Sequence, residues 1–422
     1  MPYEFTPQGQ ALLAEVKSFM DDFIYPNEEA YTKEQAEVGT HGYPPMMDKL
    51  KAAARERGLW NMFLPHLSPD APGTKLSNLD YAPVSEELGK VGFASEALNC
   101  SAPDTGNMEL LNHYASERVK EQWLQPLLDG EVRSAFGMTE PDVASSDATN
   151  IGLRIERDGD HYVLNGRKWF SSGAMNPRCK VFIVMGKTDP NAAPHKQQSM
   201  IVVPKDSPGI SIGMEPHVFG YADRGGHPEV IYENVRVPAD NILGGEGEGF
   251  ALSQARLGPG RIHHCMRTIG VAERALGLMV ERALVRTTFG SAVAQKGLIQ
   301  DWIAESRIEI DMAREYVLKT AHLMDTVGNK AAAVEISGIK VAIPNMALKV
   351  IDRAIQVWGA AGVSQYTPLA SMYAHARTLR IADGPDEVHK MTIARREIRK
   401  HDPSFRMNPT EPAGTPQPMA RP

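Results

Sequence analysis

The sequence predicts an α+β protein in which helical segments flank a central β domain. Between residues 7 and 130, apolar side chains recur at intervals of three and four, which is the spacing of one helix face. Between residues 132 and 237 they alternate in short runs separated by proline and glycine, which indicates strands and turns. After residue 249, long helical stripes return and predict the antiparallel helices of a bundle.

Four segments follow from these changes of periodicity. They are an N-terminal α-helical domain (1–131), a middle β domain (132–243), a C-terminal helical bundle (244–401) and a proline-rich tail (402–422). The tail holds six prolines in 21 residues and few apolar side chains, so we expect it to be extended or disordered. In the first domain, Ser116 is predicted to cap a helix that ends near Gly130.

Composition limits the class of protein. Of the 422 residues, 42% are hydrophobic and 23% are charged, which is typical of a soluble globular chain with a sizeable core. The formal net charge of −7 argues against a general polyanion binder, so nucleic acid is a disfavoured partner. No run approaches the roughly 18 apolar residues of a membrane span, and the N-terminus lacks the basic-then-apolar pattern of a signal peptide. We therefore expect a cytoplasmic protein.

The cysteines carry no signature of a metal site or a disulfide. Cys100, Cys179 and Cys265 are odd in number and lack metal or redox spacing, which fits unpaired thiols in a reducing compartment. His263 and His264 precede Cys265, but consecutive helix residues diverge around the axis and cannot converge on one ion. We interpret them as structural residues, or as lining of a substrate channel, and expect no metal.

Two loops of the middle domain are rich in hydroxyl and aromatic residues. A predicted strand over 132–137 leads into residues 139–142 (TEPD), which break the strand pattern and expose backbone amides. Strands over 151–157 and 161–168 are joined by Asp-Gly-Asp and predict a hairpin. Residues 169–173 (WFSSG) follow at once, and their rings and hydroxyls suit a planar ligand with polar edges, a flavin or a base.

The sequence lacks the motifs of two common nucleotide sites. No G-x-G-x-x-G follows a strand, and no G-x-x-x-x-G-K-[ST] occurs. The glycine run GEGEGF at 245–250 has no βαβ context, so we predict that it ends the β domain and begins a helix.

Several motifs occur in the order and spacing of one known family. They are the TEP loop, NGRKWFSSG, YENVRVP at 232–238, RTTFG at 286–290, QVWGAAG at 356–362 and ADG at 382–384. From about Leu12 to Lys400 the chain resembles the acyl-CoA dehydrogenases. It is most similar to the branch of family members ten and eleven, through LGPGRIHHCMRT at 257–268 and IADGPDEVH at 381–389.

The resemblance implies FAD bound between the middle β domain, which is barrel-like in that family, and a C-terminal four-helix bundle. Carried over by motif, the flavin ring would meet Phe136, Met138, Thr139, Ser145, Phe170 and Ser172, with Trp169 and Ser171 adjoining. The diphosphate and adenine would meet Arg286, Phe289, Gln356, Val357, Gly359 and Ala360, and the nucleotide end would lie near Pro385 and Glu387. Phe170 stands where the family more often has Trp, and Gly297 replaces a glutamine that contacts the cofactor across subunits.

The resemblance also implies partners. The acyl-CoA substrate would lie near Ser146, Gly258, Arg261 and Gly384. In the family, part of FAD touches a neighbouring subunit, which implies a homodimer or homotetramer, and electron-transfer flavoprotein is the expected electron acceptor. The implied process is fatty acid β-oxidation, within lipid metabolism.

The implied chemistry is α,β-dehydrogenation of an acyl-CoA thioester to a trans-2-enoyl-CoA, by an oxidoreductase acting on a CH–CH bond. A carboxylate removes the α proton while the β hydrogen leaves as hydride to flavin N5. Most of the family places a Glu base where alignment puts Asp383, and a minority places it where this chain has Gly260. Asp383 is therefore the predicted base, in an apolar pocket that would raise the pKa of a carboxyl group.

Other interpretations stay open at this point. Asp383 before Gly384 is also a common turn dipeptide, in which case Glu140 and Glu387 are the next carboxylates to consider. An Asp base on this fold also resembles nitroalkane oxidase, which passes electrons to oxygen. Some relatives bind DNA while retaining FAD, and this chain has a local basic end formed by Arg395, Arg396, Arg399 and Lys400.

Overall fold

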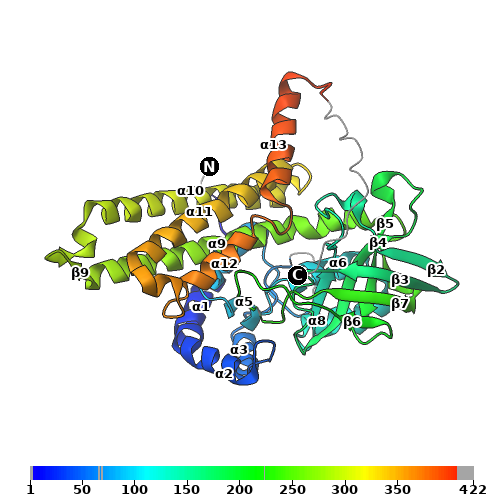
Figure 1. Ribbon diagram of the computed structural model, residues 1–422, viewed down its shortest axis with the longest axis horizontal. Coiled ribbons are helices and arrows are strands. Elements are labelled where there is room, and N and C mark those ends of the chain that lie inside the picture. Colours follow the sequence, from blue (N-terminus) through cyan, green and yellow to red (C-terminus); the bar gives the residue numbers. More distant parts are fainter. Residues whose placement is uncertain (1–2, 65–66, 68–69, 223, 406–422) are drawn as a thin grey trace. The chain divides into compact units, whose positions relative to one another are not determined.

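Residues 3–64, 67, 70–222 and 224–405 are described by the computed structural model of the chain (Figure 1). They divide into two units, which we describe one at a time. The helical unit contains residues 3–27, 75–97 and 260–405, and the sheet unit contains the described part of residues 28–74 and 98–259. The tail that was predicted to be disordered lies, beyond Phe405, outside the described residues.

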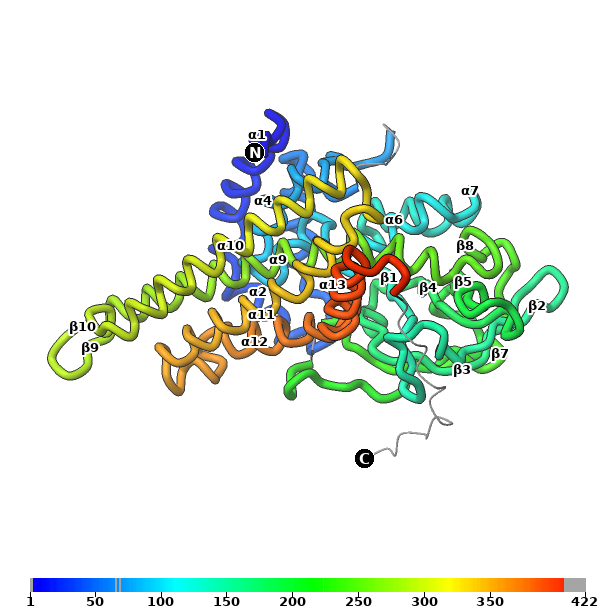
Figure 2. Tube along the Cα trace, turned by 90° about the horizontal axis from the view of Figure 1, so that it is seen from above, coloured from blue at the N-terminus to red at the C-terminus, as the bar shows by residue number. Residues whose placement is uncertain are grey.

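The helical unit is built around three long helices. Its helices are α1 (Pro7–Phe19), α4 (Asn78–Gly89), α5 (Ala94–Ala97), α9 (Gly249–Val285, from Gly260 on), α10 (Gly297–Val327), α11 (Ala333–Trp358), α12 (Leu369–Thr378) and α13 (Asp386–His401). Helices α10 and α11 run side by side, and a short hairpin of β9 (Thr287–Thr288) and β10 (Ser291–Ala292) links α9 to α10 at one end (Figure 2).

The apolar stripes that predicted these helices form their core. On α10 and α11 the buried positions are Ile310, Ala313, Val317, Ala321, Ile339, Ile343, Val350 and Ala354. Helices α4 and α9 approach so closely that a Cβ on Gly270 would lie 1.9 Å from the backbone oxygen of Glu86. A larger residue at Gly270 would push these two helices apart.

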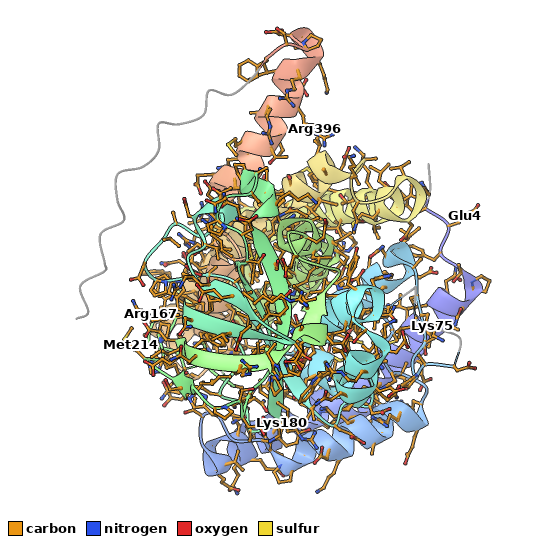
Figure 3. The ribbon with its side chains drawn as sticks, turned by 90° about the vertical axis from the view of Figure 1, so that its right-hand side faces the viewer. Glu4, Lys75, Arg167, Lys180, Met214 and Arg396 are labelled. Atoms are coloured by element: carbon orange, nitrogen blue, oxygen red, sulfur yellow. The ribbon has the colours of Figure 1, made fainter. Side chains whose placement is uncertain are left out.

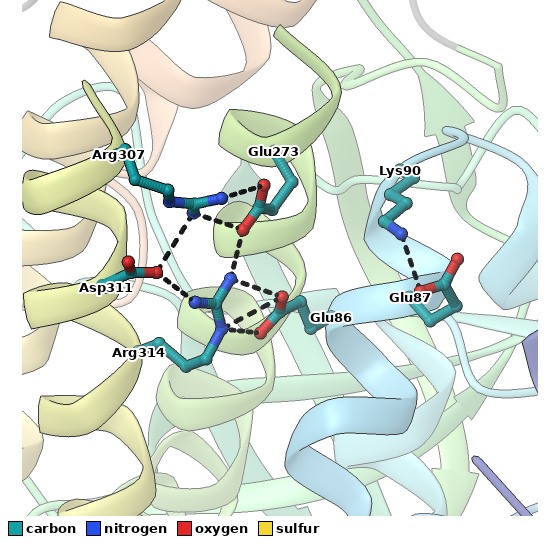
Figure 4. Close-up of polar contacts among 7 residues, drawn as sticks. All are labelled: Glu86, Glu87, Lys90, Glu273, Arg307, Asp311 and Arg314. Atoms are coloured by element: carbon teal, nitrogen blue, oxygen red, sulfur yellow. Dashed lines mark hydrogen bonds and ion pairs between the residues drawn. The ribbon is translucent and has the colours of Figure 1, made fainter. Parts of the chain in front are cut away.

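An ion-pair network joins α4, α9 and α10 on the flank of this core (Figure 4). The guanidinium of Arg314 donates to Glu86 (2.9 Å between Nη2 and Oε1), to Glu273 and to Asp311 (2.6 Å). Arg307 also donates to Glu273, at 2.5 Å. Because each carboxylate has more than one donor, the three helices are held in register by charge as well as by packing.

Helix α13 packs on α11 through its first turns, and its later side chains are largely exposed. Arg396 lies on this projecting part (Figure 3). Lys400 pairs with Glu397 at 2.6 Å, so part of the basic charge here is neutralised locally.

The sheet unit combines short helices with a twisted sheet. Its helices are α2 (Glu28–Val38), α3 (Pro45–Glu56), α6 (Asp104–Tyr114), α7 (Glu117–Val119) and α8 (Gln125–Leu128). Its strands are β1 (Arg133–Gly137), β2 (Arg154–Asp158), β3 (His161–Lys168), β4 (Cys179–Lys187), β5 (Gln198–Pro204), β6 (Ile210–Ile212), β7 (Val230–Pro238) and β8 (Ile242–Leu243). Among the described residues they form one sheet in the order β6-β7-β3-β2-β4-β5-β8, with β1 parallel to β4.

Several local sequence signals in this unit are confirmed, while the strands predicted to begin at residues 132 and 151 begin at Arg133 and Arg154. Strand β3 has the predicted bounds, and Asp158 pairs with His161 across the predicted hairpin turn. Ser116 caps α7, accepting from the backbone N–H of Val119 at 3.4 Å. Strand β2 begins at Arg154 rather than at residue 151, because the N–H groups of Gly152 and Leu153 bind a carboxylate, not a neighbouring strand.

Two further predictions, on the cysteines and on the end of the β segment, are confirmed. Cys100, Cys179 and Cys265 are buried, and none of them forms a disulfide with another described residue. The glycine run ends the β segment, and α9 begins at Gly249. No helix among the described residues is both long and apolar enough to cross a membrane.

Candidate active site

A buried ion pair anchors the first loop of the sheet unit, which follows β1. The Glu140 carboxylate accepts from Lys168 Nζ at 2.7 Å and from the backbone N–H groups of Gly152 (2.7 Å) and Leu153 (2.9 Å). Lys168 is fully buried, and burial lowers its pKa to about 8 while the Glu140 carboxylate opposes that change. Glu140 already accepts three hydrogen bonds, so it holds the loop and is poorly placed to take a proton from a ligand.

The first loop is tied to the segment after β3. The backbone N–H of Trp169 donates to Thr139 O at 3.0 Å, and the Thr139 hydroxyl donates back to Trp169 O at 2.9 Å. Lys168 Nζ also donates to Met138 O at 2.9 Å. The structure therefore brings together the two segments from which the flavin contacts were predicted.

Further contacts fix the far side of the first loop. Arg167 of β3 donates to both carboxylate oxygens of Asp142, at 2.8 and 2.9 Å, and lies at the surface of the unit (Figure 3). The hydroxyl of buried Ser145 accepts from the backbone N–H of Glu140 at 2.8 Å, closing the turn. Ser146, a predicted substrate contact, is exposed.

Phe170 presents an aromatic ring to solvent from a strained backbone. Its φ is +49°, a region that L-residues other than Gly seldom adopt, and the residue is 42% exposed. Its ring meets Trp169 edge-on, with centroids 5.1 Å apart. Strain of this kind concentrates at functional sites, because the surrounding structure has to hold it in place.

The two serines after Phe170 sit in different environments. The Ser171 hydroxyl is buried and has no hydrogen-bond partner among the described residues. The Ser172 hydroxyl lies 2.8 Å from Nδ1 of His227, a residue that the sequence did not single out. An unpartnered hydroxyl beside an exposed ring fits the polar edge and the flat face of a flavin.

A buried arginine covers the ring of Phe136. Arg256 lies with its guanidinium carbon 3.8 Å from the ring centroid and donates from Nε to Asn107 Oδ1 at 2.9 Å. Burial raises the pKa of neighbouring Glu109 to about 7, with Arg256 acting in the opposite direction. Sequence reasoning missed both charged residues, and Arg256 lies on a helix remote in the chain from Phe136, whose ring it covers.

In the helical unit, Asp383 is held between α12 and α13 by groups from two helices. Its backbone oxygen accepts from Arg261 Nε of α9 at 2.9 Å and lies 3.2 Å from His389 Nε2 of α13. Burial lowers the pKa of His389 to about 4, so the ring is neutral near pH 7 and donates from Nε2. The Asp383 carboxylate is 19% exposed and lies 3.4 Å from His264 Nε2.

The two sequence positions considered for the base, residues 383 and 260, lie beside each other in the helical unit. A Cβ on Gly260 of α9 would lie 3.6 Å from Asp383 Oδ2, so the two sequence positions face the same place. Gly384 has φ +97°, and a Cβ there would lie 2.8 Å from His389 Nε2. Only glycine fits at residue 384, and it lets the chain turn directly after Asp383.

The residues predicted to hold the nucleotide end lie elsewhere in the helical unit. Phe289 is 97% exposed on the β9–β10 hairpin, beside exposed Arg286. Gln356, Val357, Gly359 and Ala360 lie where α11 ends. Along α9, with 1.5 Å of rise per residue, Val285 is about 36 Å from Arg261. The hairpin and Asp383 of one chain are therefore too far apart to hold one cofactor together.

The remaining predicted residues occupy helix positions. Gly258 is buried within α9, Pro385 precedes the first turn of α13, and Glu387 is exposed on that turn. His263 packs edge-on against Tyr81, with centroids 5.1 Å apart, and burial lowers its pKa to about 3. His263 and His264 thus diverge, and no group of three His, Cys, Asp or Glu among the described residues could hold a metal.

Comparison with known proteins defines the class. Family models for the N-terminal, middle and C-terminal domains of acyl-CoA dehydrogenase match residues 6–131, 135–235 and 247–398. Together they describe a three-domain oxidoreductase with a helical, a β and a second helical domain. The chain belongs to the acyl-CoA dehydrogenase family.

Individual relatives confirm the similarity to members ten and eleven. Acyl-CoA dehydrogenase family member 11 of Gallus gallus is 54% identical over 398 residues, which are 93% of this chain and 50% of that protein. Probable acyl-CoA dehydrogenase FadE2 of Mycobacterium tuberculosis is 53% identical over 393 residues, 92% of this chain and 95% of that protein. The chain thus spans about half the length of its vertebrate relatives and nearly all of the mycobacterial one.

A solved structure from Mycobacterium abscessus assigned to the acyl-CoA dehydrogenases is also similar. It superposes with a TM-score of 0.91 and 48% sequence identity, covering 94% of this chain and all of that one. The predicted three-domain fold is therefore confirmed.

Proposed function

We propose that this chain catalyses FAD-dependent α,β-dehydrogenation of an acyl-CoA thioester, giving a trans-2-enoyl-CoA, with Asp383 as the base. The observation that carries the proposal is the placement of Asp383. Its carboxylate is largely buried, contacts from α9 and α13 hold the residue, and it faces the second position at which this family can carry a base. A base must be fixed near the proton that it removes, and these contacts supply that order.

Different groups of the chain have different roles in the proposed reaction. Asp383 removes the α proton, and a backbone N–H beside it polarises the thioester oxygen, which stabilises the charge that develops there. Arg261 keeps the base in place by donating a hydrogen bond to the backbone oxygen of Asp383. When bound, FAD supplies the acceptor for the β hydrogen, which leaves as hydride.

The sheet unit supplies the residues that would hold the flavin. Exposed Phe170 offers a face for stacking, and Thr139, Ser171 and Ser172 offer hydroxyls for polar ring atoms. The family implies FAD, and the unpartnered Ser171 hydroxyl supports a polar ligand at this position.

The distance along α9 supports an oligomer. If the hairpin around Arg286 and Phe289 holds the nucleotide end, it does so for the cofactor of a second copy, because Val285 beside the hairpin is about 36 Å along α9 from Arg261, the residue that contacts Asp383. We therefore propose a homodimer or homotetramer. Electron-transfer flavoprotein as acceptor, a cytoplasmic location and a role in β-oxidation stay predictions.

The rival functions have less support. A nitroalkane-oxidase-like reaction and a DNA-binding role are not favoured, since the similar proteins carry acyl-CoA dehydrogenase names. Rapid oxygen consumption with nitroethane, or a strongly salt-dependent affinity for duplex DNA, would revive one or the other.

The test is the rate of flavin reduction after Asp383→Asn. The amide keeps the shape of the side chain but cannot accept the α proton, so anaerobic stopped-flow reduction by the best acyl-CoA should slow at least ~10²-fold. Acyl-CoA binding and FAD content should persist. Asp383→Glu should keep partial activity, because the carboxylate remains but reaches one methylene further.

Glu397→Gln is the matched control, since Glu397 is an exposed carboxylate in the last turns of α13 and has no predicted role in the site. It should reduce its flavin at the parent rate. A normal rate in Asp383→Asn, or a loss of the same size in Glu397→Gln, would overturn the assignment of the base.

A further inference from the structure

The structure places Asp383 under two side chains from one face of α9. Arg261 and His264 are three residues apart, a spacing that puts them on the same side of a helix. Arg261 donates from Nε to the backbone oxygen of Asp383 at 2.9 Å, and His264 Nε2 lies 3.4 Å from its carboxylate oxygen Oδ2. Contacts from α9 thus reach both the main chain and the side chain of the same residue.

The backbone conformation of Asp383 requires contacts of this kind to hold the residue in place. Its φ is +55°, in the left-handed region, which Asp tolerates but does not prefer. Asp is also one methylene shorter than Glu, so its carboxylate reaches a substrate only if the whole residue is fixed. The missing side chain at Gly260, one helical turn before His264, leaves the space beside Oδ2 open to the imidazole ring.

A second contact sets the protonation of the ring. Nη2 of Arg267 lies 3.3 Å from His264 Nδ1, and a guanidinium can only donate hydrogen bonds. Nδ1 is therefore the acceptor, and the proton of the neutral ring is on Nε2, facing Asp383. At 3.4 Å the contact is longer than a well-formed hydrogen bond, as catalytic contacts commonly are before substrate binds.

The groups around this pair are mostly basic. Those that face it are Arg261, Cys265 and Arg267 on α9, Lys340 on α11 and His389 on α13. Burial lowers the pKa of Lys340 and of Arg261, with Asp383 opposing both changes. A neutral imidazole can orient the base without placing another full positive charge on its carboxylate, which would weaken it as a proton acceptor.

We propose that His264 is a positioning residue for the base: its Nε2–H holds the Asp383 carboxylate in the orientation for proton abstraction, and Arg267 fixes the tautomer of its ring. The proposal rests on Asp383 being the base. It concerns the proton-transfer step and not hydride transfer, so it can be tested on that step alone.

The probe is a 3-thiaacyl-CoA, whose α proton can be removed but whose sulfur at the β position has no hydrogen to give. Exchange of its α proton with D₂O, followed by NMR on the FAD-loaded protein, reports the base step. His264→Leu should slow exchange at least ~10-fold, with FAD content and affinity for the analogue unchanged. His264→Gln, which keeps a neutral N–H donor, should recover most of the rate.

The pH profile separates positioning from a structural effect. A donor favours the ionised form of the carboxylate, so its loss in His264→Leu should move the acidic limb of the exchange profile to higher pH, and His264→Gln should return it. Arg267→Leu should give a smaller loss of a few-fold, because the ring stays but its tautomer is no longer fixed. His322→Leu, at an exposed histidine of α10, is the matched control and should match the parent.

The outcomes distinguish the two proposals. Suppose that Asp383→Asn abolishes exchange of the α proton, while His264→Leu and Arg267→Leu keep the exchange rate and the acidic limb of the parent. The positioning role of His264 is then wrong, and the assignment of Asp383 as the base is kept. If Asp383→Asn exchanges normally, both are wrong. If His264→Leu does not fold, the pH profile of exchange in Arg267→Leu decides between the outcomes. An unchanged acidic limb in that profile would contradict the fixed tautomer.

Discussion

At the scale of single residues, the Glu140–Lys168 pair shows how much of the cofactor loop depends on one buried contact. Lys168 is completely buried, and its Nζ serves Met138 O as well as Glu140. Two predicted flavin contacts, Met138 and Thr139, precede Glu140 directly in the loop. The loop therefore keeps its shape only while the pair is intact.

Glu140→Gln should destabilise the protein strongly. It removes the negative partner and leaves the buried charge of Lys168 uncompensated, which costs about 3 kcal/mol in the free energy of unfolding. Urea denaturation followed by circular dichroism measures the change. Glu233→Gln, at an exposed glutamate of β7, is the control and should shift stability by less than about 0.5 kcal/mol. Equal stability of the two variants would show that the pair does not hold the loop.

At the scale of elements, the network on Arg314 is what joins α4 to α9 and α10 by charge (Figure 4). Burial raises the pKa of Glu273, but hydrogen bonds from Arg307 and Arg314 outweigh it and hold the pKa below its usual 4.5. A carboxylate with a lowered folded pKa stabilises the fold above pH 4.5, and that stabilisation is lost as the pH falls through the folded value.

Arg314→Met should therefore lower stability in a pH-dependent way. At pH 7 it leaves Glu86 and Glu273 without a shared donor and costs about 2 kcal/mol. The difference from the parent should shrink as the pH falls below 4.5, where Glu273 takes up a proton. Denaturant titrations at pH 7 and pH 3.5 test this. The control is Lys349→Met, which breaks an exposed ion pair with Glu309 and should lower the free energy of unfolding by about 0.5 kcal/mol or less. A loss of stability in Arg314→Met that does not depend on pH would point to packing instead of charge.

At the scale of the whole molecule, the β9–β10 hairpin and the adjoining end of α9 expose large apolar side chains that a single chain does not cover. Leu284, Val285 and Phe289 are 64%, 77% and 97% exposed at the same end of α9. Large exposed apolar side chains gathered in one place mark interaction sites. This agrees with a cofactor site that is completed by a second copy.

Arg286→Ala should weaken FAD retention without unfolding the chain. It would remove the proposed charge-assisted contact to the diphosphate, while the Arg286 side chain is exposed and contributes no core packing. FAD released during gel filtration, with the oligomeric state read by light scattering, measures the effect. Lys319→Ala on exposed α10 surface is the control. A parent protein that is a stable monomer with tightly bound FAD would contradict the shared site.

Much of the fold could be predicted because its signals are local. The bounds of β3, the hairpin turn at residues 158–160, the cap at Ser116 and the start of α9 each depend on neighbours within a few positions. Helical and strand periodicity show in the sequence because side-chain direction repeats every 3.6 or 2 residues. The family motifs likewise indicated which segments are candidates for the site, and that assignment stays a prediction.

The partners of the site residues were decided by the tertiary structure. Ser172 and His227 are 55 positions apart and meet because β3 pairs with β7, in a register that places Lys168 opposite Val230. His264 and Asp383 come from separate helices and meet only when the helical unit is packed. Long-range contacts follow from chain topology and from the filling of a dense core, which no local pattern encodes. The sequence by itself therefore determined the elements and the nature of the candidate base, and only the packed chain decided what holds that base in place.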